Sequence, residues 1–179
     1  MDQRIIEFMH AMVGRLPAFD ALAVISAVAA PYVVAGILCA FVVRSAATSR
    51  IRLHVVLLAF LVTLIVPGLI VSLMRFVYPE PRPFVVLGWK PLVAHTADDP
   101  AFPSRHAAGL FALAVILYRA NPRWGWWVFG VAALNAVARV YVGVHWPSDV
   151  IAGALIGSAI AGILVYVLPP PLGDDRKIA

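Results

Sequence analysis

IRLHVVLLAFLVTLIVPGLIVSLMRFV, residues 51–77, is the stretch that decides the fold class. It is longer than the roughly 17–25 residues with which a helix crosses a bilayer, and its charged side chains lie near its two ends. The Pro67-Gly68 pair near the middle fits a membrane helix, because neighbouring helices satisfy the backbone groups that a proline frees. We therefore expect a membrane-spanning helix over 51–77.

Four further apolar segments extend this pattern on both sides. We expect spanning helices over residues 18–43, 104–118, 124–142 and 147–168, with Pro31 as a kink in the first. The whole chain is 63% hydrophobic and only 13% charged, whereas a soluble domain is about half apolar and about a quarter charged. The sequence therefore predicts an all-α, multipass membrane helical bundle with about five transmembrane helices, forming a single domain over 1–179.

The first residues follow a different pattern. Apolar residues recur at helical spacing among charged ones, which indicates an amphipathic helix over 1–16 lying at the membrane interface; they are Ile5, Ile6, Met9, Met12 and Val13. The fifth span carries small residues at four-residue steps, Gly153, Gly157 and Ala161, a spacing that lets helices approach closely. We favour packing within one subunit over a dimer interface, and the oligomeric state stays open.

Composition also excludes several classes of protein. The formal charge is +5, but the basic residues lie at segment ends and form no basic stripe, so no nucleic-acid partner is expected. Cys39 is the single cysteine, which excludes a disulfide framework and a thiolate metal site.

Three short polar clusters interrupt the apolar segments. They read RFVYPEPRP over 75–83, PSRH over 103–106 and RVYVGVHWPSD over 139–149. Arginine forks match phosphate oxygens, and histidine can attack phosphorus or transfer a proton. Most of these residues fall where an apolar segment begins or ends, so the set predicts a phosphoryl-transfer site at one end of the bundle, in a catalytic region over 75–149.

Spacing suggests individual roles within the clusters. His145 and Asp149 are four residues apart at a helix start and can share one face, so the carboxylate would fix the histidine tautomer and leave a nucleophilic nitrogen free. Ser104 is expected to be the N-cap of a helix whose first turn attracts anions, and His106 in that turn would act as general acid. Arg139 would reach the same phosphate. Arg75 and Arg82 would also bind phosphate, although snorkelling to lipid headgroups is an alternative for Arg75.

The clusters resemble the signature of the type 2 phosphatidic acid phosphatase superfamily, Lys-x6-Arg-Pro, Pro-Ser-Gly-His and Ser-Arg-x5-His-x3-Asp. The resemblance implies a metal-independent mechanism without cofactors, through a phosphohistidine on His145 oriented by Asp149, with His106 as general acid. Phosphate would be held by Arg75, Arg82, Ser104 and Arg139. The chain departs from the signature at three positions, with Arg75 for lysine, Arg105 for glycine and Ala138 for serine. We expect Arg105 to contact the second phosphate of a diphosphate substrate.

Within that superfamily, EPRPF at 80–84, HTAD at 95–98 and AFPSRH at 101–106 look most like bacterial undecaprenyl-diphosphate phosphatases. That resemblance implies removal of the terminal phosphate from undecaprenyl diphosphate, which yields the carrier lipid undecaprenyl phosphate for cell-wall synthesis. His95 and Asp98 would form either a polar lid over the diphosphate or a solvated loop.

Orientation follows from positive charge in short loops. With five spans, three basic groups fall on one side, which is expected to be cytoplasmic: Arg44, Arg50 and Arg52, then Arg119 and Arg123, then Arg176 and Lys177. The clusters then face the extracytoplasmic side of the cell membrane.

Two other readings remain. The same chemistry fits another membrane lipid, such as phosphatidylglycerophosphate, phosphatidate or a lipid A phosphate. A non-enzymatic transporter of anionic lipids would also use arginines, but the chain shows no inverted repeat. Vanadium haloperoxidases carry a related signature and are soluble, which disagrees with this hydropathy.

Overall fold

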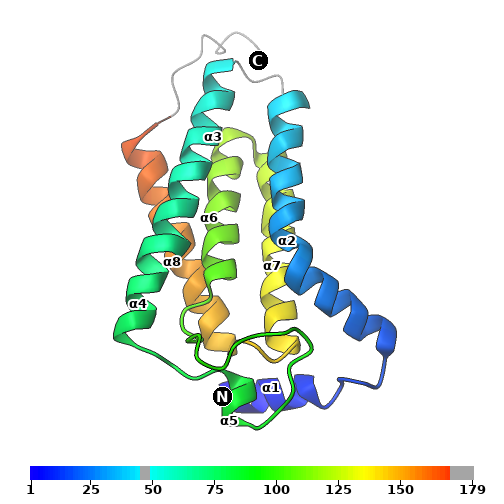
Figure 1. Ribbon diagram of the computed structural model, residues 1–179. Coiled ribbons are helices and arrows are strands. Elements are labelled where there is room, and N and C mark those ends of the chain that lie inside the picture. The colour runs from blue at the N-terminus through cyan, green and yellow to red at the C-terminus, as the bar shows by residue number, and fades with distance from the viewer. Residues whose placement is uncertain (45–48, 170–179) are drawn as a thin grey trace.

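The computed structural model describes residues 1–44 and 49–169, and within them every regular element is a helix (Figure 1). The elements are α1 (Asp2–His10), α2 (Pro17–Arg44), α3 (Ser49–Thr63), the π-helical segment η1 (Leu64–Ile70), α4 (Val71–Val77), α5 (Pro83–Val86), α6 (Arg105–Ala120), α7 (Pro122–Tyr141) and α8 (Pro147–Val167). The predicted all-α membrane bundle is confirmed.

Five long helical columns run side by side, with α3, η1 and α4 forming one continuous column (Figure 1). Three of the columns are long and apolar enough to cross a membrane: Pro17–Arg44, Arg50–Val77 and Pro147–Val167. With 16 residues, α6 is only about 24 Å long at 1.5 Å per residue. It lies inside the bundle, packed against α7, α8 and the α3–η1 column.

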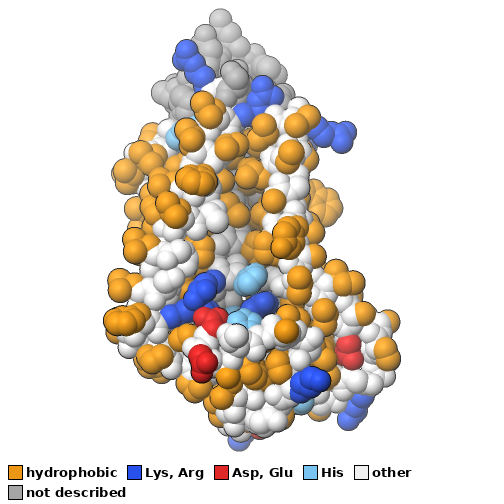
Figure 2. All heavy atoms as spheres, viewed as in Figure 1, with side chains coloured by type: hydrophobic (Ala, Val, Ile, Leu, Met, Phe, Trp, Pro, Cys, Tyr) orange, Lys and Arg blue, Asp and Glu red, His pale blue; other side chains and the backbone are white. Residues whose placement is uncertain are grey.

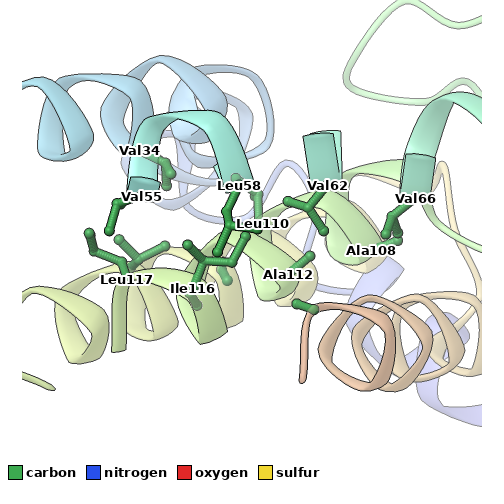
Figure 3. Packing of buried hydrophobic residues seen from close by; sticks show 14 of the residues in the cluster. Val34, Val55, Leu58, Val62, Val66, Ala108, Leu110, Ala112, Ile116 and Leu117 are labelled. Carbon is green, nitrogen blue, oxygen red and sulfur yellow. The ribbon is translucent and has the colours of Figure 1, made fainter. Parts of the chain in front are cut away.

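The core lies where α6 meets α2 and α3. Val34 of α2, Leu58 and Val62 of α3, and Leu110 and Ile116 of α6 point toward one another there (Figure 3), and all five are at most 5% exposed. A proline removes one backbone hydrogen bond from a helix. The column accommodates Pro67 by the wider π-helical turn of η1, a common response to such an interruption.

Glycines bring α6 and α8 into very close contact. A Cβ added at Gly153 would lie 2.6 Å from the Ser104 carbonyl oxygen, and one added at Gly157 would overlap the backbone of Ala108. The small-residue spacing therefore serves packing within one chain, as the sequence led us to favour.

The first helix is shorter than the predicted range 1–16, because α1 ends at His10. A turn follows in which Gly14 has φ +81°, a conformation that favours glycine, and α2 begins at Pro17. Ile6 is 1% exposed and packs with Val140 and Val150. This helix is thus docked against α7 and α8, at the end of the bundle where α6 and α8 begin (Figure 1).

Candidate active site

The three polar clusters converge at one end of the bundle. They come from the end of α4, the start of α5, the start of α6, the end of α7 and the α7–α8 connection. Figure 2 shows basic, acidic and histidine side chains gathering there, below a hollow between two helical columns. The buried polar set includes Arg75, Arg82, Ser104, Arg139, His145 and Asp149, each at most 4% exposed.

His145 is held by the turn into α8. The chain leaves α7 through Gly143, whose φ is +85°, and Trp146 then serves as the N-cap of α8 with Pro147 in its first turn. Asp149 lies in that turn, where its Oδ2 accepts a hydrogen bond from the Trp146 backbone N–H at 2.8 Å. The same oxygen lies 3.2 Å from His145 Nδ1. The expected pairing of His145 and Asp149 is therefore present.

The two partners of the imidazole fix its tautomer. The Asp149 carboxylate accepts a hydrogen bond, so Nδ1 of His145 carries the ring proton. The Arg82 guanidinium can only donate, so His145 Nε2, which lies 3.3 Å from Arg82 Nη1, presents a lone pair to it. Burial lowers the pKa of His145 well below its ordinary value of 6.5, and the guanidiniums of Arg139 and Arg82 lower it further. The ring is thus neutral at pH 7, with the nitrogen that faces the arginines unprotonated.

Arg82 ties the first cluster to the third. As N-cap of α5 it is 1% exposed, and its Nη1 donates to the Val144 carbonyl at 2.6 Å. Its Nη2 donates to Asp99 Oδ2 at 2.7 Å and to the Pro100 carbonyl at 3.2 Å. Its Nε donates to the Asp99 carbonyl at 2.7 Å. The guanidinium therefore bridges the loop before α6 and the turn that carries His145.

Arg75 faces the loop before α6 from the end of α4. Its Nε and Nη2 donate to the Pro103 carbonyl at 3.1 and 3.0 Å, and Nη2 also reaches the Ala101 carbonyl at 3.3 Å. Its Nη1 donates to Asp99 Oδ1 at 3.0 Å. A side chain with these bonds and 4% exposure is not snorkelling to lipid headgroups, so that alternative is excluded for this conformation.

Asp99 is the residue at this site that the sequence pattern missed. Its carboxylate makes ion pairs with Arg75, Arg82 and Arg105, at 3.0, 2.7 and 3.1 Å. Burial alone would raise the pKa of Asp99, but the three guanidiniums outweigh it and lower the pKa below its usual value. The neighbouring Asp98, which the sequence singled out, is exposed. The excess of arginines over carboxylates in the three clusters is a signal in the sequence that could have indicated a further acidic partner.

The start of α6 meets expectation in its cap. Ser104 is the N-cap, its Oγ accepts from the Ala107 backbone N–H at 3.4 Å, and its own N–H donates to the Asp149 carbonyl at 3.0 Å. His106 and Arg105 line an apolar cavity of about 580 Å³ that continues between α2 and the α3–η1 column. Arg105 is the most exposed of the candidate residues, with 45% of its side chain accessible.

Arg139 completes the set from the last turn of α7. It is 4% exposed, and its buried Nε has no hydrogen-bond partner among the residues that the structure describes. Its charge acts on His145, which places it within electrostatic reach of the imidazole. All eight candidate residues thus lie at the same end of the bundle, and Asp99 joins them.

Known proteins resemble this chain in both sequence and fold. An undecaprenyl-diphosphatase of Sulfolobus acidocaldarius is 39% identical over 106 residues, which are 58% of this chain and 50% of that relative. Undecaprenyl-diphosphatase BcrC of Bacillus subtilis is 36% identical over 102 residues, 56% of this chain and 52% of the relative. The chain spans about half the length of both. The crystal structure of Aquifex aeolicus LpxE superposes with a TM-score of 0.69 at 23% identity, covering 93% of this chain and 94% of the other, which shows a shared fold.

The family match covers the same part of the molecule as the site. The PAP2 superfamily pattern fits residues 56–171, a segment that begins within α3, runs past the end of α8 and contains all three polar clusters. Because this segment is more than half of the chain and carries the converging clusters, the chain belongs to the PAP2 superfamily.

Proposed function

We propose that this chain is a membrane lipid phosphatase that removes the terminal phosphate of undecaprenyl diphosphate and releases undecaprenyl phosphate. The observation that carries the proposal is the setting of His145. Its Nδ1 is held by Asp149 and its Nε2 faces the Arg82 guanidinium at 3.3 Å, at a bundle end where an apolar cavity meets the start of α6. A neutral, oriented imidazole beside a phosphate-binding cation is what attack on phosphorus requires.

The reaction proceeds in two steps. His145 Nε2 attacks the terminal phosphorus, and the bond from phosphorus to the bridging oxygen breaks. His106, which takes up a proton from solvent when the anionic substrate offsets the charge of the arginines, donates that proton to the bridging oxygen as the lipid monophosphate leaves. Water then attacks the phosphohistidine with His106 as base, which releases inorganic phosphate and restores the free imidazole. Asp149 stabilises the positive charge that develops on His145 in both transition states.

Arginines supply the charge that neutralises the phosphate. Arg75, Arg82 and Arg139 are buried at the same end of the bundle as the imidazole, and the buried Nε of Arg139 would gain an acceptor when a phosphate oxygen arrives. The capped N-terminus of α6 adds backbone N–H groups and the positive end of a helix dipole. These fixed dipoles and charges stabilise the transition state without a metal ion or cofactor.

The lipid chain has a path that begins at the site. The cavity that Arg105 and His106 line is otherwise bounded mostly by apolar side chains of α2, α3 and α6, among them Val34, Phe60 and Leu113. A prenyl or acyl chain lying there places its diphosphate at the start of α6, with the second phosphate next to Arg105. The names of the two undecaprenyl-diphosphatase relatives support this substrate over a monophosphate lipid.

We further propose that the site faces the extracytoplasmic side of the cell membrane. Arg44, Arg50 and Arg52 lie at the α2–α3 end of the bundle and Arg119 and Arg123 at the α6–α7 connection, opposite the site (Figure 1). Positive charge in short loops marks the cytoplasmic side. Arg176 and Lys177, which the sequence added to this group, lie outside the described residues. A site facing outward would recycle the carrier lipid that cell-wall synthesis leaves as a diphosphate.

The test is phosphate release by the purified chain in detergent, with undecaprenyl diphosphate as substrate and EDTA present. A His145→Ala variant is the negative control, and a panel of phosphatidylglycerophosphate, phosphatidate and lipid A phosphate serves as the competing substrates. Release that survives EDTA and disappears in the variant is expected. Faster release from another lipid would reassign the substrate, and equal release by His145→Ala would refute the mechanism.

A further inference from the structure

Asp99 forms ion pairs with Arg75, Arg82 and Arg105, three of the arginines that are proposed to bind the substrate phosphates. We propose that the Asp99 carboxylate competes with phosphate, so that substrate must displace it from Arg75, Arg82 and Arg105, and that its return expels inorganic phosphate. This inference rests on the proposed function, and it assigns to Asp99 the control of phosphate affinity. Asp99 is thereby a positioning residue, since it acts through the arginines.

The hydrogen bonds of Arg82 make the competition unavoidable. A guanidinium has five N–H groups, and those of Arg82 serve the Asp99, Val144 and Pro100 carbonyls, the Asp99 carboxylate and His145. The bonds to the three carbonyls hold the guanidinium in the protein framework. The Arg82 N–H groups that remain available to a substrate anion are therefore the one that now contacts Asp99 Oδ2 and the one that now contacts His145.

Arg75 shows the same division, and Arg105 adds a third guanidinium to the same carboxylate. Arg75 spends its Nε and Nη2 on the Ala101 and Pro103 carbonyls, and its Nη1 goes to Asp99 Oδ1 at 3.0 Å. Arg105 donates from Nη2 to the same oxygen at 3.1 Å. One carboxylate therefore gathers three guanidiniums with both of its oxygens, as a phosphate would with two of its own.

The place of the carboxylate also suits a competitor. The Arg82 guanidinium contacts both groups, because its Nη2 lies 2.7 Å from Asp99 Oδ2 and its Nη1 lies 3.3 Å from His145 Nε2. The Asp99 carboxylate and the proposed nucleophilic nitrogen are therefore separated by a single guanidinium group. Asp99 belongs to the irregular segment between α5 and α6, and its side chain is 25% exposed. A partly exposed side chain on a segment without helical hydrogen bonds can move aside, and an arriving phosphate would replace the ion pairs that it leaves.

A purely structural Asp99 predicts the opposite effect of its removal. If the carboxylate only held the arginines in place, its loss would let three like charges separate and phosphate would bind more weakly. If it competes, its loss frees N–H groups and phosphate binds more tightly. The sign of the change in affinity therefore separates the two roles.

The experiment measures inorganic phosphate binding by titration calorimetry on the full chain in detergent. Asp99→Asn, which keeps the shape and removes the charge, is expected to lower the Kd for phosphate about tenfold, the scale of one charge-assisted hydrogen bond. The substrate KM should fall in parallel, and kcat should fall because phosphate leaves more slowly. Asp98→Asn, the exposed neighbour, is the matched control and should match wild type. An unchanged or higher Kd in Asp99→Asn would overturn the proposal.

Two further measurements guard the result. Asp99→Glu restores the charge and should bring the Kd back toward wild type, which a shape effect would not do. If Asp99→Asn does not fold, hydrogen exchange on the wild type decides: phosphate should increase exchange over residues 96–103 when the carboxylate leaves, and increased protection would overturn the proposal. A wild type that releases no phosphate from lipids, with the tenfold shift intact, would refute the proposed function and leave the competition standing.

Discussion

Adding one methyl group at Gly153, deep in the α6–α8 contact, should impair catalysis although no candidate site residue is replaced. The Cβ of an alanine there would lie 2.6 Å from the Ser104 carbonyl oxygen and 3.1 Å from the Ala107 Cβ. Ordinary contact begins at 3.4 Å, so α6 and α8 must separate by about 0.8 Å at this point. Both neighbours belong to the start of α6, next to the proposed phosphate site.

The separation acts where the two halves of the site are joined. The Ser104 backbone N–H donates to the Asp149 carbonyl at 3.0 Å, so a shift of 0.8 Å would lengthen that bond beyond its useful range. The start of α6, with His106, would move relative to the start of α8, with Asp149 and His145. A misplacement of about 1 Å can reduce a rate about 100-fold. We expect Gly153→Ala to lower kcat by roughly that factor, with a smaller change in KM.

The assay is phosphate release in detergent with Gly162→Ala as matched control. Gly162 lies on the same helix, and a Cβ added there meets nothing within 4 Å. The control therefore makes the same chemical change without the contact, and it should keep wild-type activity. Thermal unfolding in detergent should show that Gly153→Ala still folds. If both variants had the same kcat, close packing of α6 on α8 would not position the site, and the reasoning would fail.

Three more outcomes follow from the geometry. Asp149→Asn keeps an acceptor for His145 Nδ1 but loses the charge that stabilises the imidazolium, so kcat should fall about 10²–10⁴-fold, measured as phosphate release, and a loss below tenfold would contradict the role. The lowered pKa of His145 keeps its ring neutral as pH falls, so the titration of this ring, followed by NMR, should lie below pH 6.5, and a titration above that value would be inconsistent with the buried, arginine-flanked ring. Ala35→Trp places a large side chain in the apolar cavity, so the KM for undecaprenyl diphosphate should rise at least about tenfold, the scale of one lost apolar contact. The KM for a short-chain prenyl diphosphate should stay unchanged, and an equal effect on both substrates would place the lipid chain elsewhere.

The helices were predictable because a long, strongly apolar segment is typical of a helix in a membrane protein. The expected spans 104–118 and 147–168 correspond to α6 (Arg105–Ala120) and α8 (Pro147–Val167), with ends that differ by at most two residues. The expected span 51–77 is one column, but its middle is π-helical at Pro67. Hydropathy carries no information on that local geometry. The length of α1 was overestimated because apolar residues continue at helical spacing past His10, whereas the chain turns there before α2 begins.

The convergence of the candidate site residues was predictable from the sequence, and their arrangement only partly. Helix starts position His145, Asp149 and Ser104, and the capping and spacing patterns of a helix start can be recognised in the sequence. The hydrogen bonds of these residues match expectation. Arg105 was expected to contact the second phosphate of a diphosphate substrate, and in this structure it forms an ion pair with Asp99. The segment before α6 has no periodicity from which the direction of a side chain could be inferred. Choosing Asp98 instead of Asp99 therefore followed from the absence of a local rule there.

In the proposed mechanism, the hydrolysis and the lipid chain meet at the first turn of α6. Arg105 binds Asp99 and also lines the apolar cavity, and His106, the proposed acid, lines the same cavity. A lipid lying in the cavity would therefore present its bridging oxygen to His106, and its terminal phosphate would lie among the buried arginines. The glycine contacts hold this turn against α8, which positions Asp149 and His145. Binding the chain and aligning the reacting atoms thus depend on one helix end. Substitutions that fill the cavity should therefore raise KM, whereas substitutions at the α6–α8 contact should lower kcat.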